Sequence, residues 1–456
     1  MHRLDKHRLN EYAKETMDFL RNENIPLFRK TFLKLHSMDQ ATIFVALDLK
    51  ERAKLYHNIS AEEFSNIFQE LDYKVQRMIL QELHETYAAD MFNEMNTDDA
   101  ASFLVALPEK MQRGLLQKMN DTEASEIQEL MGYPEETAGS IMTKDYVQIR
   151  AASTAREVLA YLQTEKPDAE TIYYLYVVNE HNKLTGILSL RELITNNPSE
   201  RVENLMRTQL ITIQDDDDQE DVARIIQHYD LLALPVLTDA GALVGIVTVD
   251  DVMDVVEDET TEDIGELSAV RGATDVNLSA FASARKRAPW LILLMFLGLL
   301  TGGVIDQFEE TLEAVVILAV FIPMIMDSAG NIGTQSLAVV VRGIAVGTFQ
   351  RESIRQLLKR QLGTGLMVGL MCGAVIFVVV PLIPFFDGSW MLGAIVGISI
   401  FLSLSIACVV GAIMPLIINK LKLDPALASG PFVTTIGDVV GLFIYFSIAT
   451  SLLQYL

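Results

Sequence analysis

The sequence predicts a mixed fold: a cytosolic α-solenoid and a tandem α/β pair, followed by an all-α bundle of five transmembrane helices, in a dimeric protein. Three observations predict it. Pairs of apolar residues recur every 12 residues between Ile43 and Met131. A β-α-β-β-α pattern then occurs twice between Gly139 and Asp258, and five long apolar segments follow Phe281.

Charge is distributed unevenly along the 456 residues. Residues 1–280 carry 52 acidic and 26 basic side chains, whereas the remainder carries 9 and 10. Such an acidic half argues against nucleic acid as a partner, since phosphates need a basic face. The N-terminus has no signal-peptide pattern and both cysteines lie in apolar runs, so residues 1–280 are expected in the cytoplasm. We find no phosphate-binding loop and no catalytic constellation, and we expect a protein that is not an enzyme.

A stack of short helices is predicted for the N-terminal third. After a single charged helix over residues 1–36, an apolar-x-x-x-apolar pair recurs at a 12-residue pitch. Spacing of i, i+4 puts both members of a pair on one helical face, and the pitch leaves about two turns of helix and a connector. Such helices share one continuous core, with Asp98 and Asp99 outside it. The pairs are Ile43/Leu47, Leu55/Ile59, Ile67/Leu71, Ile79/Leu83, Met91/Met95, Phe103/Leu107, Leu115/Met119 and Ile127/Met131.

A doubled α/β module follows. Each copy has a β-rich run, Ile172–Val178 or Leu231–Leu237, then a turn, a second strand and a helix start. Both hairpins share the pattern V-(V/L)-(N/T)-(E/D)-x-(N/G)-x-L-x-G-I. The doubled pattern resembles a pair of CBS modules, which implies a regulatory unit that binds an adenine nucleotide such as ATP, or ions, and that dimerises. A pair that serves as a dimerisation scaffold alone is the alternative.

Two acidic stretches lie in and after the second copy. Asp215–Asp218 precedes a predicted helix, where acids suit the macrodipole and act as a cap. The alternative is that they contribute, with Glu220, Asp230 and Asp251, to hydrated divalent-ion sites. Residues 257–266 are mostly acidic or hydroxylic and are predicted to form a helix that joins the soluble part to the membrane part. This helix is either a solvated linker or a gate whose carboxylates a cation neutralises.

Five apolar segments are near or above the length that spans a bilayer. With five spans, all ten Lys and Arg residues of this half fall on one side of the membrane. The positive-inside rule then predicts a plasma-membrane protein with a cytoplasmic N-terminus and an outward C-terminus. The segments cover roughly residues 289–305, 314–341, 362–383, 390–418 and 426–453.

Two of these spans carry a carboxylate, Asp327 in the second and Asp438 in the fifth. An ionisable residue at membrane depth marks an ion pathway by default, because it costs several kcal/mol there. Carboxylate, hydroxyl, amide and carbonyl oxygens are ligands of a hard divalent cation. We therefore predict a pore for such an ion, completed across a dimer because the number of spans is odd. The alternative is that either aspartate bonds a neighbouring helix and does nothing else.

Proline and glycine residues are predicted to interrupt both of these spans and to free backbone carbonyls toward a cavity. They are Pro323, Gly330 and Gly333 in the second span, and Pro425, Gly430, Pro431 and Gly437 in the fifth.

These elements in this order resemble the MgtE family of magnesium channels along essentially the whole chain. The most specific motifs are Pro323…Gly330-Asn331-x-Gly333-x-Gln335-Ser336 and Asp424-Pro425-Ala426…Gly430-Pro431…Asp438. The resemblance implies a homodimeric, magnesium-selective pore, closed when cytosolic magnesium cross-links the acidic domains. It also implies that Asp438 is the ion-binding aspartate. Asp327 stands where the family has a small residue, which implies extra negative charge in this pore.

Matching positions give the implied site residues. The cation ligands are Asp438, Asp424, Asp218, Glu220, Asp230, Asp251, Glu259, Glu262 and Asp263, with Asp98 and Asp99 as looser matches. The pore-lining residues are Asp327, Asn331, Gly333, Gln335, Gly430 and Thr434. The domains are the superhelix 1–136, the CBS modules 137–200 and 201–258, the connecting helix 259–284 and the pore 285–456.

The expected function is passive magnesium uptake, which the membrane potential favours by roughly 4–5 kcal/mol per 100 mV. A proton- or sodium-coupled transporter is the first alternative, with Asp327 and Asp438 as a relay and a flux that depends on pH. A sensor that reads nucleotide at the CBS pair without transporting anything is the second. Oxygen ligands alone do not distinguish magnesium from cobalt or manganese.

Overall fold

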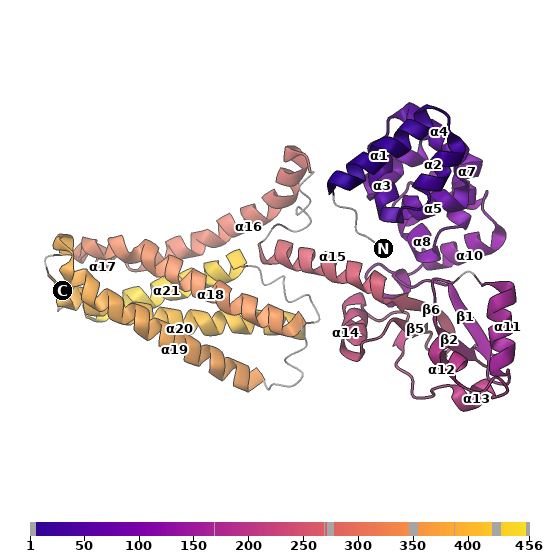
Figure 1. Ribbon diagram of the computed structural model, residues 1–456. Coiled ribbons are helices and arrows are strands. Elements are labelled where there is room, and N and C mark those ends of the chain that lie inside the picture. The colour runs from indigo at the N-terminus through magenta and orange to yellow at the C-terminus, as the bar shows by residue number, and fades with distance from the viewer. Residues whose placement is uncertain are drawn as a thin grey trace. The chain divides into compact units, whose positions relative to one another are not determined.

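The computed structural model describes residues 6–167, 169–268, 270, 278–345, 354–386, 388–421 and 430–452. The chain divides into two compact units, Met1–Val256 and Glu257–Leu456. The first contains a stack of short helices and two small sheets, and the second contains long helices (Figure 1).

The N-terminal residues form two helices instead of the predicted single one. These are α1 (Lys6–Arg21) and α2 (Ile25–Phe32). Pro26 lies in the first turn of α2, where a missing N–H leaves no hydrogen bond unmade, whereas inside a continuous helix it would remove one. Glu23 has a φ of 59°, a left-handed conformation typical of helix ends.

Eight short helices, α3 to α10, form the predicted solenoid. Asp48 and Ser60 accept hydrogen bonds from the first N–H groups of α4 and α5 and complete capping boxes. The apolar pairs line one continuous core, in which the ring of Phe68 contacts those of Phe92 and Phe103. The predicted core is thus confirmed. The helices are α3 Ser37–Val45, α4 Leu49–Asn58, α5 Ala61–Gln69, α6 Tyr73–Leu80, α7 Glu85–Asn93, α8 Thr97–Val105, α9 Glu109–Leu116 and α10 Asp121–Leu130.

The α/β part repeats one unit twice, as predicted. In each copy the first strand pairs parallel to the second, and the second pairs antiparallel to the third. One helix follows the first strand and another follows the hairpin (Figure 1). The first copy is β1 Tyr146–Arg150, α11 Ala155–Glu165, β2 Thr171–Val178, β3 Leu184–Ser189 and α12 Leu190–Thr195. The second is β4 Ile213–Gln214, α14 Gln219–Tyr229, β5 Ala233–Leu237, β6 Leu243–Thr248 and α15 Val249–Leu267, after the short helix α13 Val202–Leu205.

The two copies exchange backbone contacts in a symmetric way. Thr143, which precedes β1, pairs with Ile246 of β6, and Arg207, which precedes β4, pairs with Ile187 of β3. Thr143 and Arg207 therefore occupy equivalent places in an internal pseudo-twofold arrangement. In each copy, the segment before the first strand therefore pairs with the hairpin of the other copy.

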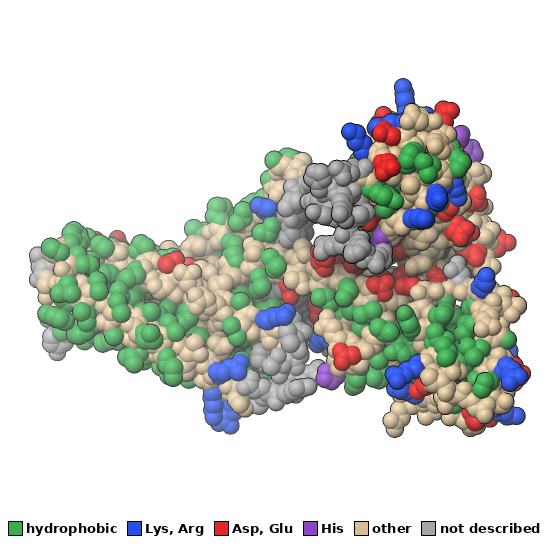
Figure 2. Space-filling view, viewed as in Figure 1, with side chains coloured by type: hydrophobic (Ala, Val, Ile, Leu, Met, Phe, Trp, Pro, Cys, Tyr) green, Lys and Arg blue, Asp and Glu red, His purple; other side chains and the backbone are tan. Residues whose placement is uncertain are grey.

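Five helical segments of the second unit are long and apolar enough to cross a membrane, as predicted. Hydrophobic side chains cover the face of this unit that Figure 2 shows, and Met295, Phe296 and Leu299 of α16 are exposed. Lipid accommodates such a surface, whereas water does not. The segments are α16 Ala280–Gln307, α18 Ile322–Ala345 with the 3-10 turn Val316–Phe321 before it, α19 Ile354–Leu382, α20 Trp390–Lys420 and α21 Gly430–Ser451.

The prediction that glycines break the spans is wrong. The helix α18 continues through Gly330 and Gly333, and α21 continues through Gly437. The irregular backbone of the second span ends instead where α18 begins, next to Pro323. The predicted break at Pro425 lies outside the described residues.

These glycines allow close helix contacts. A Cβ on Gly330 would lie 2.5 Å from a methyl of Thr434, and a Cβ on Gly437 would lie 3.3 Å from the carbonyl oxygen of Ala329. Small residues at such positions let membrane helices pack backbone to backbone. The sequence signal for a broken helix was therefore a signal for tight packing of α18 against α21.

Replacing Gly411 by Ala should destabilise the second unit. The added Cβ would overlap the carbonyl oxygen of Gly333, a backbone atom, so α20 and α18 would have to separate. Overpacking of this kind costs about 1–3 kcal/mol, and we expect a fall of roughly 2–10 °C in the thermal unfolding midpoint of the purified protein. Gly363→Ala is the control, because a Cβ at that position meets open space. Equal midpoints for the two variants would contradict the proposed helix contact.

Candidate functional site

Three carboxylates from separate parts of the first unit converge in what we call the acidic cluster: Asp98, Glu170 and Asp251. One oxygen of each lies within 4.8 Å of the others. Asp98 lies in the first turn of α8, Glu170 directly precedes β2, and Asp251 lies in the first turn of α15. The expectation that Asp98 lies outside, in solvent, is wrong: its exposed fraction is 7%, because the first α/β copy and the start of α15 pack against this end of α8.

Thr248, the last residue of β6, connects two of the three carboxylates of the acidic cluster, Glu170 and Asp251. The N–H of Thr248 donates to Oδ2 of Asp251 (3.3 Å). Its Oγ1 lies 3.1 Å from Oε1 of Glu170 and 2.7 Å from Oδ1 of Asp250, and it also contacts Asp251. One hydroxyl carries a single proton, so it donates to one carboxylate at a time. Thr248 therefore orders the acidic cluster without satisfying it.

The acidic cluster is electrostatically costly as it stands. Oδ1 of Asp98 and Oε2 of Glu170 are buried and have no hydrogen-bond partner among the described residues. Burial, together with the neighbouring acids, raises the pKa of Glu170 to about 8 and that of Asp251 to about 6. The same causes raise the pKa of Asp98 well above its ordinary range. Unpartnered carboxylate oxygens held this close are a ligand set for a hard divalent cation such as Mg²⁺.

At the equivalent position of the first copy, the acidic charge is neutralised by an arginine of the protein. Glu192 of α12 corresponds to Asp251 of α15, and Nε of Arg207 donates to Oε1 of Glu192 (3.2 Å). Thr143 stands where the pseudo-symmetry would put a second arginine. The second copy therefore has acids where the first copy has an ion pair, which is the difference that a bound metal would compensate.

Without divalent cations the first unit should lose stability as pH rises. A group whose folded pKa lies above its unfolded value favours the folded state at low pH, and that advantage is lost as pH rises through the folded pKa. For Glu170 the window runs from 4.5 to about 8. We expect the thermal midpoint of the full chain in chelator to fall across this window. Added Mg²⁺ should raise it more at the upper end, since metal binds the ionised carboxylates. A midpoint in chelator that increases with pH would contradict the raised pKa of Glu170.

The predicted ligands on α14 lie apart from the acidic cluster. Asp218 caps α14 by accepting the N–H of Glu220 (2.8 Å), and Asp230 ends the same helix in a left-handed conformation. Eleven helical residues separate the two ends by about 16 Å, which is too far for one ion to bridge. Asp99 is exposed and accepts a hydrogen bond from Gln69 (2.8 Å). For Asp218 the structure supports the capping interpretation.

Three further predicted ligands lie on α15, beyond the boundary of the first unit: Glu259, Glu262 and Asp263. Their spacing of three and four residues places them on neighbouring positions of one helix face. Among the described residues, these three carboxylates do not come close enough together to form a group that could hold one ion. Asp424 lies outside the described residues.

A polar stripe runs along α18 in the second unit. It consists of Asp327, Asn331 and Gln335, all of which are exposed. Positions i, i+4 and i+8 share one helix face over about 12 Å. Lipid offers these groups no hydrogen bonds, so such a face within a membrane borders water, a cavity or another chain.

Asp438 lies on α21, the helix that packs on α18. Its Oδ1 is buried without a hydrogen-bond partner among the described residues, and its charge interacts with that of Asp327. About one turn away, the hydroxyls of Thr334 and Thr434 lie 3.3 Å apart. Carboxylate and hydroxyl oxygens thus collect where α18 meets α21, which is the chemistry that a hydrated dication requires.

Gly333 and Gly430, which were predicted to line the pore, lie in contacts between helices. Gly333 is buried under Val433, and Gly430 is buried at the start of α21 against Thr334. Both lie in helix contacts and not on the polar stripe. They shape the wall that carries the polar groups, because a side chain at either position would push α18 and α21 apart.

Comparison with known families identifies both units. Residues 322–448 match the MgtE family model, described as "Divalent cation transporter", and residues 35–136 match the "MgtE intracellular N domain". Residues 138–197 and 202–258 match the CBS domain. "Magnesium transporter MgtE" of Bacillus subtilis is 40% identical over 437 residues, with 96% of each chain covered. This chain belongs to the MgtE family.

Other proteins of the MgtE family agree with this assignment. "Magnesium transporter MgtE" of Enterococcus faecalis is 43% identical, with 96% of each chain covered. A solved structure of "the soluble part of a magnesium transporter" is 40% identical and has a TM-score of 0.54, covering 55% of this chain and 99% of that one. A cytosolic domain of "the Mg2+ channel MgtE in complex with ATP" is 34% identical with a TM-score of 0.50, covering 53% of this chain and 99% of that one.

The domain matches explain why the sequence of this MgtE chain did not reveal its acidic cluster. Asp98 falls in the matched N domain, whereas Glu170 and Asp251 fall in the two CBS matches. Glu170 was missed because it lies in the loop before β2, far along the sequence from both Asp98 and Asp251. Thr334 was missed because its partner is 100 residues away.

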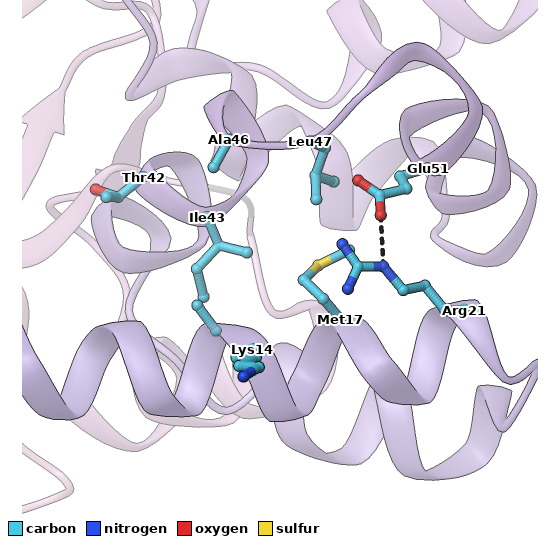
Figure 3. Close-up of a pocket in the computed structure, with 9 residues that line it drawn as sticks. Lys14, Met17, Arg21, Thr42, Ile43, Ala46, Leu47 and Glu51 are labelled. Atoms are coloured by element: carbon cyan, nitrogen blue, oxygen red, sulfur yellow. Dashed lines mark hydrogen bonds and ion pairs between the residues drawn. The ribbon is translucent and has the colours of Figure 1, made fainter.

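A cavity of about 200 Å³ lies between the first helices of the solenoid, and its charges differ from those of the acidic cluster (Figure 3). Its acid, Glu51, accepts a hydrogen bond from Nε of Arg21 (2.7 Å), so its charge is already balanced. Met17 and Leu47 supply apolar walls. This cavity lacks the feature that distinguishes the acidic cluster, which is unbalanced buried charge.

Proposed function

We propose that this chain is a magnesium channel that admits Mg²⁺ passively and closes when Mg²⁺ binds its acidic soluble part. The observation that carries the proposal is the polar stripe beside Asp438, in helices otherwise apolar enough to cross a bilayer. Relatives named "Magnesium transporter MgtE" support magnesium as the ion.

The chemistry of the stripe suits an ion that keeps its water. Mg²⁺ dehydrates reluctantly and holds waters at about 2.1 Å. The carboxylate of Asp327 and the amide oxygens of Asn331 and Gln335 can accept hydrogen bonds from those waters. Binding through water is weak enough for release, as conduction requires. The membrane potential supplies the driving force, so a pump is not needed.

A second copy of the chain completes the pathway in this proposal. Facing lipid, the polar stripe would be left without hydrogen bonds. Two chains related by a twofold axis would place two stripes around one aqueous pore, with two Asp438 carboxylates for one dication. A homodimer therefore accounts for the exposed stripe and for the single unpartnered carboxylate of α21 together.

Closure is assigned to the acidic cluster and α15. Bound Mg²⁺ would replace repulsion among Asp98, Glu170 and Asp251 with attraction, so the ion favours the arrangement that brings them together. The helix α15 starts beside Asp251, and at its other end Leu267 packs with Val433 of α21. A change at the acidic cluster can thus reach the pore helices through one continuous helix.

Finer features complete the proposal. The distribution of Lys and Arg supports a plasma-membrane protein with a cytoplasmic N-terminus and an outward C-terminus. The ATP complex of a similar cytosolic domain supports an adenine nucleotide as a second ligand of the CBS pair. The domain boundaries stay as proposed: 1–136, 137–200, 201–258, 259–284 and 285–456.

The proposal is tested by magnesium flux into liposomes that contain the purified protein. A channel gives flux that reverses at the magnesium equilibrium potential and does not follow the pH gradient. Flux that follows a proton or sodium gradient would overturn the passive mechanism and favour the coupled transporter. Protein-free liposomes and liposomes with the Gly363→Ala variant serve as controls.

Replacing Asp327 by Ser should weaken magnesium binding in the pathway without abolishing flux. Asp327 adds a charge to the stripe and interacts with Asp438, so its loss lowers the local concentration of cations. We expect the magnesium concentration for half-maximal flux to increase roughly three- to tenfold, as loss of about 1 kcal/mol of attraction gives. Glu310→Gln, at an exposed acid outside the stripe, is the matched control. An unchanged half-maximal concentration would remove Asp327 from the pathway.

A further inference from the structure

The Thr143–Asp145 segment touches the solenoid at the point where α8 begins. The N–H of Thr97 donates to Oδ2 of Asp145 (2.9 Å), and Oγ1 of Thr97 accepts the N–H of Lys144 (2.9 Å). Nζ of Lys144 also forms an ion pair with Glu129 of α10 (2.5 Å). Since Asp98 follows Thr97 directly, these contacts fix where the first carboxylate of the acidic cluster lies.

The same segment holds the other two contributors. The carbonyl oxygen of Asp145 accepts the N–H of Glu170 (2.9 Å). Thr143 exchanges two backbone hydrogen bonds with Ile246 of β6 (2.8 and 3.0 Å), and Thr248 at the end of β6 is bonded to Asp250 and Asp251 at the start of α15. Three consecutive residues are therefore bonded to all three elements that bring carboxylates to the acidic cluster.

The Asp145 carboxylate is a structural acceptor and not a further ligand. Its Oδ2 takes the N–H of Thr97 and the hydroxyl of Thr143 (3.1 Å). Both threonines are buried, with exposed fractions of 3% and 0%. Charge-assisted hydrogen bonds in such a buried place are strong and directional, so they set geometry.

We propose that the Thr143–Asp145 segment is the positioning element of the acidic cluster, which fixes the spacing of its three carboxylates so that a divalent cation can bridge them. The inference rests on the proposed regulatory role of the cluster. Groups that orient metal ligands change metal affinity by about 10–100-fold when they are lost, although they never touch the ion. Preorganisation also explains how mutually repelling carboxylates stay together until the ion binds.

The test is a Mg²⁺ titration of the thermal midpoint of the purified full-length protein, in wild type, Asp145→Ala and Thr97→Val. Thr97→Val keeps the shape of the side chain and removes the hydroxyl that accepts the Lys144 N–H. We expect the Mg²⁺ concentration at half-maximal stabilisation to increase by about tenfold in Asp145→Ala and less in Thr97→Val. Glu157→Ala is the matched control, since this carboxylate also accepts one backbone N–H and one hydroxyl, at the start of α11.

The outcomes separate the inference from the function on which it rests. A lower midpoint with an unchanged Mg²⁺ concentration, as expected for Glu157→Ala, would make the segment merely structural and overturn the inference. Asp251→Asn is run in parallel. If Asp251→Asn shifts the Mg²⁺ dependence and neither Asp145→Ala nor Thr97→Val does, the inference alone fails. If Asp251→Asn shifts nothing, the acidic cluster is not the regulatory site and both fail.

Discussion

Replacing Asp438 by Asn should abolish most of the magnesium flux. The substitution keeps the shape of the side chain and removes the charge of a half-buried carboxylate on α21, whose Oδ1 is buried, where α21 packs on α18. Losing several kcal/mol of attraction for a dication at membrane depth should lower flux by on the order of 100-fold or more. The measurement is the initial rate of Mg²⁺ entry into liposomes at matched protein density.

Two controls make the Asp438 result specific. Glu310→Gln removes a charge from an exposed acid outside the stripe and should leave flux near the wild-type rate. The thermal midpoint of Asp438→Asn should stay at or above that of wild type, since the change removes a poorly solvated carboxylate. Wild-type flux through Asp438→Asn would show that the pathway lies elsewhere in the chain.

Replacing Asp251 by Asn should have opposite effects with and without Mg²⁺. In chelator the variant removes one of three crowded carboxylates, so its thermal midpoint should exceed that of wild type by a few degrees. At high Mg²⁺ the order should reverse, because wild type gains stability from the bridging ion and the variant gains little. The two titration curves should therefore cross.

Asp121→Asn is the control for the crossing, since Asp121 is an exposed acid of the same unit, at the start of α10 and outside the acidic cluster. Its curve should run parallel to that of wild type. Parallel curves for Asp251→Asn would mean that the acidic cluster takes up no ion. A lower midpoint in chelator would mean that the three carboxylates do not repel one another as their positions imply.

Most of the architecture could be predicted from periodicity. The 12-residue recurrence of apolar pairs such as Phe103/Leu107 requires a stack of short helices, since each pair must face a shared core. The doubled hairpin pattern likewise determined the order of strands and helices in both CBS modules. Helix breaks were harder to predict. Pro26 starts α2 where one helix was expected, and Gly330 sits inside a helix where a break was expected, because the outcome depends on what packs there.

Site residues could be predicted only where the surrounding sequence made a single residue stand out. Asp327 and Asp438 are conspicuous because carboxylates are rare in apolar runs. The acidic cluster is not local: Asp98 is buried by a domain that follows it in the chain, and Glu170 reaches it through a backbone bond to Asp145. By contrast, the conspicuous run Asp215–Asp218 proved to include a helix cap. Acid density in a sequence therefore indicates ion sites poorly without the fold.

The most direct test of the central claim is the current through single channels as Mg²⁺ on the cytoplasmic side is stepped from about 10 µM to about 10 mM. We expect channels that are open at low Mg²⁺ and close at high Mg²⁺, with a much weaker closure in Asp251→Asn. Currents that ignore cytoplasmic Mg²⁺, or that close equally in Asp251→Asn, would contradict gating through the acidic cluster.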